Sequence, residues 1–131
     1  MIVLDTHALV WWVAGDPSLS KKARSAIERA RSEGALAASA ISAWEIAMLV
    51  RHERLALTMD VDAWLATVAR IDGMRFVPVD ADIATQSTAL PGTFHKDPAD
   101  RMIVATARRL GASLVTRDEK IRAYAHVKTL W

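Results

Sequence analysis

The segment HKDPADRMIVATA, residues 95–107, joins an acidic turn to a helix that is almost wholly apolar. Asp97 is placed to cap this helix, and Pro98 occupies its first position, where a missing N–H costs nothing. Asp100 follows three residues after the cap, where its carboxylate faces the positive end of the helix dipole. The apolar run Met102–Ala107 predicts that the helix is buried on most of its surface. Helix capping explains this segment by itself, so a second role for Asp100 needs support from the rest of the chain.

The length and composition limit the kinds of protein this chain can be. Its 131 residues predict one domain, spanning residues 1–131. The chain has no cysteine, which excludes a disulfide framework and thiolate metal sites. The apolar N-terminus lacks a basic leader, and no run is long and apolar enough to span a bilayer, so we expect a soluble, cytoplasmic protein. The net charge of +2 is compatible with binding nucleic acid but does not require it.

Strand and helix patterns alternate along the whole sequence. The predicted strands are Ile2–Asp5, Leu36–Ser39, Arg75–Val79, Ser113–Thr116 and Val127–Leu130. The predicted helices run from Thr6 to Val13, from Ser18 or Ser20 to about Glu33, from Ser42 to Val50, from Asp60 or Asp62 to Ile71, from Asp80 to Leu90 and from Asp97 to Gly111, with one short helical turn after Asp118. This alternation predicts an α/β fold with a central parallel sheet and helices on both faces. Right-handed crossovers then bring the carboxyl ends of the strands to one edge, where such folds bind ligands.

Four acidic residues are expected at that edge. Asp5 ends the first strand, and Glu45 lies in a predicted capping box with Ser42, in the first turn of the helix after the second strand. Asp100 begins the helix that leads to the fourth strand, and Asp118 follows that strand. Each acid has a sufficient structural explanation as a turn or capping residue. Together, however, their carboxylates would repel one another unless a cation or protons compensate the charge.

The residue types indicate which cation suits this edge. Carboxylate oxygens are the natural ligands of hard divalent cations, and no histidine and cysteine cluster competes for zinc. Mg²⁺ or Mn²⁺ held by carboxylates binds substrate phosphates and activates water. The acids therefore predict a metal-dependent enzyme that hydrolyses phosphodiester bonds.

Four motifs in this order carry a resemblance to a known family. They are Leu4-Asp5-Thr6-His7, Ser42-Ala43-Trp44-Glu45-Ile46-Ala47, His95-Lys96-Asp97-Pro98-Ala99-Asp100-Arg101 and Val115-Thr116-Arg117-Asp118. At this spacing the chain resembles the PIN-domain family, and more closely the VapC-type ribonuclease toxins of type II toxin–antitoxin pairs. The motifs extend over nearly the whole chain, and the ordered set is far more specific than any single motif.

The resemblance implies more than the residues do alone. It implies a three-layer α/β/α sandwich, Mg²⁺- or Mn²⁺-dependent cleavage of RNA, a homodimer, and a cognate antitoxin that inserts into the site. Carried over by position, the catalytic and metal-binding residues are Asp5, Glu45, Asp100 and Asp118. Thr6 and Thr116 would orient them.

Two other classes of function compete with this interpretation. A PIN-like module that binds nucleic acid or protein without cutting would be expected to lack some of the acids, and this chain retains all four. A phosphotransfer enzyme or receiver domain would use Asp5 as nucleophile. Phosphatases of the haloacid dehalogenase type need a second aspartate two residues later, where this chain has His7, and the strand before Asp5 lacks the acidic pair of a receiver domain.

Four further residues beside the predicted site have two explanations each. Helix capping explains Asp97 fully, although it stands next to the acids. Arg101 either contacts an RNA phosphate or a site carboxylate, or is a solvated helix residue. His7 and His95 either touch RNA and exchange protons, or are local structure, since activated water needs no histidine base.

The consecutive residues Trp11 and Trp12 cannot face the same core wall, because neighbouring helix positions point in different directions. One hypothesis is that Trp11, with Met48 and Leu49, forms an apolar groove for an antitoxin helix. Burial of Trp11 in the core is the alternative.

Overall fold

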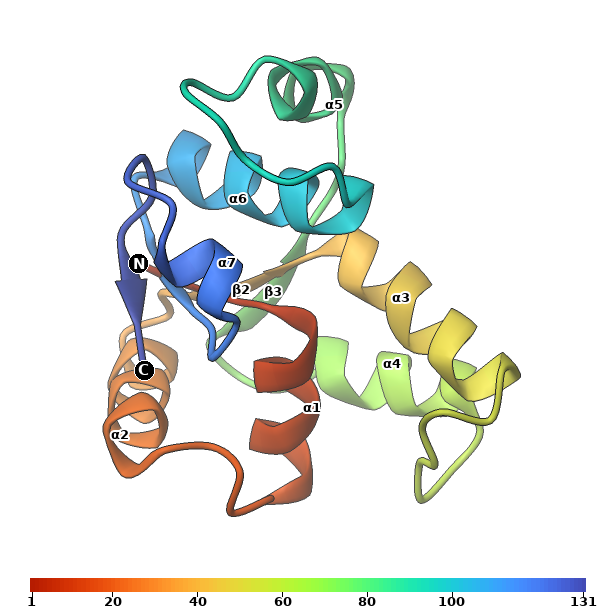
Figure 1. The fold of residues 1–131 in the computed structure, drawn as a ribbon. Coiled ribbons are helices and arrows are strands. Elements are labelled where there is room, and N and C mark those ends of the chain that lie inside the picture. The colour runs from red at the N-terminus through yellow and green to blue at the C-terminus, as the bar shows by residue number, and fades with distance from the viewer.

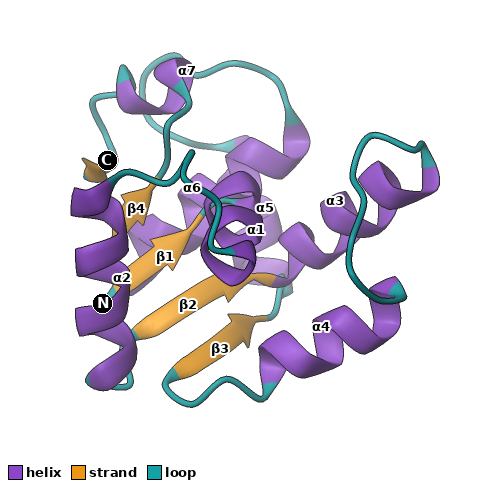
Figure 2. Ribbon diagram, turned by 90° about the horizontal axis from the view of Figure 1, so that it is seen from below, coloured by secondary structure: helices purple, strands orange, loops and turns teal.

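A computed structural model describes residues 1–131 as a parallel sheet between two layers of helices (Figure 1). The strands are β1 (Ile2–Leu4), β2 (Leu36–Ser39), β3 (Met74–Val77), β4 (Ser113–Val115) and β5 (Thr129–Leu130). The helices are α1 (Thr6–Ala14), α2 (Lys21–Ser32), α3 (Ala40–Arg51), α4 (Val61–Ala69), α5 (Ala81–Thr88), α6 (Pro98–Leu110) and α7 (Glu119–Arg122). All strand pairs are parallel, in the order β3-β2-β1-β4-β5 (Figure 2), which confirms the predicted α/β class.

Both faces of the sheet are buried, and neighbouring residues of a strand serve opposite faces. In β1, Leu4 packs with α1, α2 and α4, whereas Val3 packs with α5, α6 and α7. Figure 1 shows α5 and α6 on one side of the sheet and α1, α2 and α4 on the other. This burial on both faces is why the strands read as apolar runs rather than as alternating patterns.

The strand order reverses between β1 and β4, the two central neighbours of the sheet. The chain moves outward from β1 through β2 to β3, and then returns to build β4 and β5 on the other side of β1. At such a reversal the connecting loops diverge, which leaves a crevice at the carboxyl ends of the strands. The N–H of Asp5 donates to the carbonyl of Val115 at 3.1 Å, so the two strand ends are tied together at this crevice.

Most helix starts follow the predicted caps, and two do not. Asp80 and Asp97 cap their helices as expected, and of the alternatives Ser18 or Ser20 and Asp60 or Asp62 the caps are Ser20 and Asp60. Helix α1 is capped by Asp5 rather than Thr6, because the Asp5 carboxylate accepts from the N–H of Ala8 at 2.8 Å. None of the seven helices combines the length and the apolar surface needed to cross a membrane.

Helix α3 begins earlier than the sequence suggested. Its cap is Ser39, the last residue of β2, whose hydroxyl accepts from the N–H of Ile41 at 3.1 Å. The predicted capping box of Ser42 and Glu45 is therefore wrong, and Glu45 lies in the second turn. The physical reason is that Ser39 already serves as the cap by accepting from one exposed N–H of the helix start, which leaves Ser42 and Glu45 free for other partners.

Candidate active site

Two of the predicted acids follow the strands that flank the reversal of strand order. Asp5 comes directly after β1 and caps α1. Asp118 follows β4 and caps α7, with its Oδ1 accepting from the N–H of Ile121 at 3.0 Å. Between them, the Thr116 hydroxyl oxygen accepts from the N–H of Asp118 at 3.0 Å. The Thr116 side chain also opposes the rise in the pKa of Asp5 that burial causes. Backbone and threonine contacts thus hold both carboxylates at one edge, as expected.

The third acid lies at the start of α6. Asp97 Oδ1 accepts from the N–H of Asp100 at 2.9 Å, which confirms the predicted cap. Pro98 stands in the first turn, so the direction in which the helix leaves the loop is restricted. The carboxylate of Asp100 is not used in the cap, and its Oδ2 lies 3.1 Å from His95 Nε2.

The fourth acid, Glu45, is held by a contact across two helices. Thr6 on α1 donates its hydroxyl proton to Glu45 Oε1 at 2.5 Å, and its oxygen lies 2.9 Å from the hydroxyl of buried Ser42. Ser42 is thus a partner of Thr6 rather than a helix cap. This contact supports the expectation that Thr6 orients a site carboxylate.

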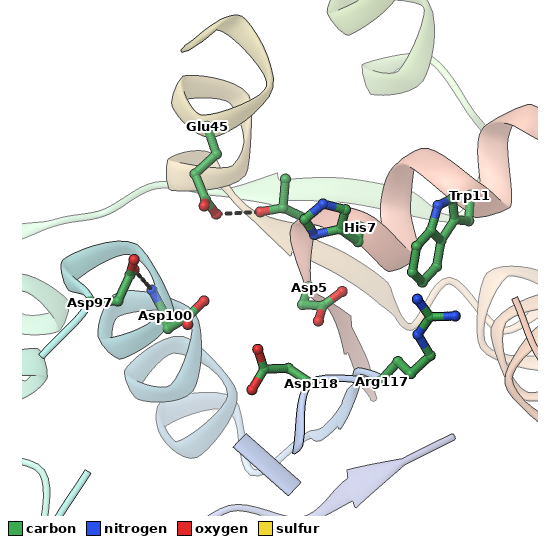
Figure 3. A pocket seen from close by; sticks show the side chains of 9 residues that line it. Asp5, His7, Trp11, Glu45, Asp97, Asp100, Arg117 and Asp118 are labelled. Carbon is green, nitrogen blue, oxygen red and sulfur yellow. Dashed lines mark hydrogen bonds between the residues drawn. The ribbon is translucent and has the colours of Figure 1, made fainter. Parts of the chain in front are cut away.

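All four acids line one pocket of about 420 Å³ (Figure 3). The sequence predicted that they would meet, and the fold brings them together from four separate segments. The complete lining is Asp5, Thr6, His7, Trp11, Glu45, Asp97, Asp100, Arg117 and Asp118. Asp97, interpreted from the sequence as a helix cap, is therefore also a fifth carboxyl group of the pocket.

The pocket opposes ionisation of its own acids. Burial raises the pKa of Asp5 and of Glu45 above the usual values for these residues. Burial also raises the pKa of Asp100 to about 7, and the negative charges of Asp97 and Glu45 add to the effect. At neutral pH the negative charge of these carboxyl groups is therefore not balanced within the pocket. A cation or bound protons can balance it.

The chemistry of the donor set fits a hard divalent cation. The candidate ligands Asp5, Glu45, Asp100 and Asp118 offer only oxygen atoms, and they line one pocket without forming an ion pair to lysine or arginine. No three of the acids or histidines lie close enough together to form a ready-made coordination shell. Binding a metal here would therefore require the side chains to draw together.

Three residues left open by the sequence now have defined surroundings. Arg101 contacts no site carboxylate, because its guanidinium donates to the backbone carbonyls of Ser87, Phe94 and His95 at 2.7–3.1 Å. It anchors the loop that precedes α6. Among the histidines, His7 is exposed and lines the pocket, whereas His95 is half-buried beside Asp100.

Two pocket residues were not identified from the sequence. Trp11 lines the pocket, and the guanidinium of Arg117 lies 4.6 Å from the centre of its ring. Trp11 lines this pocket, whereas Met48 and Leu49 line a neighbouring pocket that shares Glu45 with it, so the hypothesis of one groove for an antitoxin helix stays a prediction. One signal was available: Arg117 directly precedes Asp118, just after a strand that ends at the same edge.

Comparison with known proteins agrees with this architecture. Residues 2–127 match the model of the PIN domain family. The chain is 40% identical over 132 residues to Ribonuclease VapC22 of Mycobacterium tuberculosis (strain ATCC 25618 / H37Rv), covering 99% of this chain and 98% of that protein.

Solved structures share the fold at low sequence identity. VapBC2 from Rickettsia felis, bound to a DNA fragment from its promoter, aligns with a TM-score of 0.68 and 17% identity, covering 99% of this chain and 98% of the other. A toxin–antitoxin complex from Klebsiella pneumoniae aligns with a TM-score of 0.64 and 21% identity, covering 97% and 95%.

The parallel sheet and the acid pocket at its strand reversal define an α/β protein with an acidic candidate active site. The family match and the full-length relative then make the assignment specific: the chain belongs to the PIN domain family, in its VapC branch.

Proposed function

We propose that this protein is a cytoplasmic, Mg²⁺- or Mn²⁺-dependent endoribonuclease and the toxin of a toxin–antitoxin pair. The observation that carries the proposal is the pocket in which Asp5, Glu45, Asp100 and Asp118 gather without a compensating lysine or arginine ion pair. The full-length likeness to Ribonuclease VapC22 supports RNA as the substrate.

In this proposal each acidic residue has a role that follows from its position in the pocket. Asp5, Asp100 and Asp118 hold the ion, and Glu45, restrained by Thr6, positions an ion or the attacking water. When bound, the ion would lower the pKa of that water and stabilise the charge on the leaving oxygen. Asp100, whose carboxyl group has a pKa of about 7, is partly protonated near neutral pH and would have to lose this proton to hold the ion.

We also propose an antitoxin partner and a homodimer. The toxin–antitoxin complex from Klebsiella pneumoniae and the VapBC2 structure, which share this fold, support the first. Size-exclusion chromatography with light scattering, with and without the co-expressed antitoxin, measures both.

The test is cleavage of total RNA by purified protein, free of copurified partner, with Mg²⁺, Mn²⁺ or EDTA. We expect discrete fragments that require metal. Asp100→Asn should lower the cleavage rate more than about 100-fold, exceeding the usual effect of losing a residue that only supports a metal ligand. The fold should survive, because Asp97 still caps α6 and a repelling charge is removed.

Asp82→Asn is the matched control, since it removes a carboxylate on α5 that does not line the pocket. It should cleave like the parent protein. Cleavage that persists in Asp100→Asn would refute the site. No cleavage by folded protein that binds metal would favour a non-catalytic binding module.

A further inference from the structure

Trp11 and Arg117 form a cation–π pair at the edge of the pocket that the acids line. The Arg117 guanidinium lies over the Trp11 ring at 4.6 Å, the geometry of a cation–π contact. Figure 3 shows this pair on one side of the pocket, with Asp100 and Asp97 on the other.

The ring beneath the guanidinium is itself held in place. Trp11 is half-buried, packs against the main core on the α1 side of the sheet, and meets the edge of Trp131 at 5.9 Å between ring centroids. On the pocket side its neighbour is the exposed ring of His7, at 5.6 Å. Arg117 therefore rests on a supported surface rather than on a mobile side chain.

Arg117 forms no ion pair within the chain, although its charge helps to lower the pKa of Asp16 after the hydrogen bonds from Ser18. Arg109 pairs with Asp80 and Asp82, Arg31 pairs with Glu28, and no such ion pair forms at Arg117. Its side chain is exposed, and it is the only lysine or arginine among the nine residues that line the pocket. An arginine that is fixed by an aromatic ring and forms no ion pair at contact distance has its N–H donors available for a ligand.

We propose that Arg117 binds a phosphate of the RNA next to the phosphate that is cut, and that Trp11 is the positioning residue that orients it. This inference rests on the proposed function. The five carboxyl groups of the pocket repel a polyanion, so an RNA backbone that enters it needs an anchor just outside. Arg117 lies at the edge of the pocket with its guanidinium already oriented, and phosphate contacts of this kind fix the register of a nucleic acid on a protein.

The test separates binding from cleavage. Fluorescence anisotropy of a short, fluorescein-labelled, single-stranded RNA of mixed sequence is measured in EDTA over a series of KCl concentrations. Arg117→Gln should weaken binding about tenfold, the scale of one charged hydrogen bond. It should also reduce the slope of log Kd against log salt by about 0.7, the value for one phosphate contact on a single strand.

Trp11→Leu should weaken binding about two- to fivefold, and Trp11→Phe should restore most of the loss, because phenylalanine keeps an aromatic face under the guanidinium. Arg122→Gln is the control of equal charge, since Arg122 lies on α7 outside the pocket lining. It should leave the affinity and the salt slope nearly unchanged. Circular dichroism of each variant verifies the fold, and Arg117→Gln keeps the test decisive if Trp11→Leu unfolds.

Unchanged affinity and slope in Arg117→Gln would overturn the proposal, as would an equal loss in Arg122→Gln or no binding by the parent protein at low salt. These results are independent of catalysis. Metal-dependent cleavage with unchanged binding in Arg117→Gln refutes the phosphate subsite alone. Arg117-dependent binding without cleavage under any metal refutes the nuclease alone.

Discussion

Two clusters of acidic residues in this protein have opposite electrostatic surroundings. At the start of α5, Asp80 and Asp82 are exposed, and Arg109 on α6 bridges them at 2.8 and 3.1 Å. In the pocket, Asp5, Glu45 and Asp100 are wholly or partly buried and have no arginine or lysine in contact. An arginine of the chain pairs with the first cluster, whereas the second has no lysine or arginine partner and only His95 beside Asp100.

The pKa values follow this difference. The N–H of Ile83 and the nearby guanidinium of Arg109 lower the pKa of Asp80, so its charge is stabilised by folding. Burial and neighbouring carboxylates raise the pKa of Asp100 to about 7, so its charge opposes folding. An acid cluster without a lysine or arginine partner supports the proposed cation-binding site.

The largest expected effect that separates the clusters is stabilisation by metal. Mg²⁺ or Mn²⁺ at 100 times its Kd should raise the free energy of unfolding by about 2.7 kcal/mol, since it binds only the folded pocket. Thermal or urea unfolding in MgCl₂ or MnCl₂, against EDTA with KCl at the same ionic strength, measures this. Asp82→Asn should keep the effect and Asp100→Asn should lose most of it. Equal stabilisation of both variants would locate the metal elsewhere.

The next largest effect is that Asp100 and Asp80 change the stability of the fold with pH in opposite directions. Between pH 3.8 and about 7 the unfolded chain ionises Asp100 while the folded chain keeps it protonated, so its contribution to stability falls as the pH rises. Asp80, whose pKa is lowered, stabilises the fold above pH 3.8, and this contribution is lost as the pH falls through its folded pKa.

Urea unfolding across pH 3 to 8 in EDTA therefore compares each variant with the parent protein. Asp100→Asn should gain stability relative to the parent from pH 4 to 7, whereas Asp80→Asn should lose relative stability as the pH rises toward 4. Asparagine still caps α5, so the second comparison isolates the charge. A stability difference between Asp100→Asn and the parent that does not change with pH would contradict the burial argument.

The smallest expected effect is at the compensated cluster. Arg109→Gln removes two ion pairs whose side chains are 40–55% exposed, and exposed pairs contribute between zero and about 1 kcal/mol each. The free energy of unfolding should fall by about 1 kcal/mol or less, with a smaller loss at high salt. RNA cleavage should not change. A drop in cleavage would mean that the two clusters are coupled.

Local patterns in the sequence were sufficient for much of the fold. The caps Asp80 and Asp97, and Ser20 and Asp60 as one of two alternatives each, could be predicted because a cap depends on residues two or three positions apart. The apolar strands likewise indicated a sheet buried on both faces. The errors came where two polar residues competed for one role, as when Ser39 and not Ser42 capped α3.

The site was predictable to a similar extent. The position of each acid after a strand or at a helix start was enough to bring Asp5, Glu45, Asp100 and Asp118 to one edge, because parallel strands share their carboxyl end. The contacts of Trp11 were not predicted, because its ring meets Arg117 and Trp131 from the far end of the chain. The spacing of apolar residues along a helix gives no information about contacts with such distant parts of the chain.

By itself, the sequence determined the order of the elements, the α/β class and the set of acids at the edge of the sheet. These depend on spacing along the chain. Only the tertiary structure decided that the pKa of Asp100 is about 7, that Thr6 holds Glu45 and that Arg117 rests on Trp11. These properties depend on burial and on distances between remote segments, which packing sets after the elements have formed.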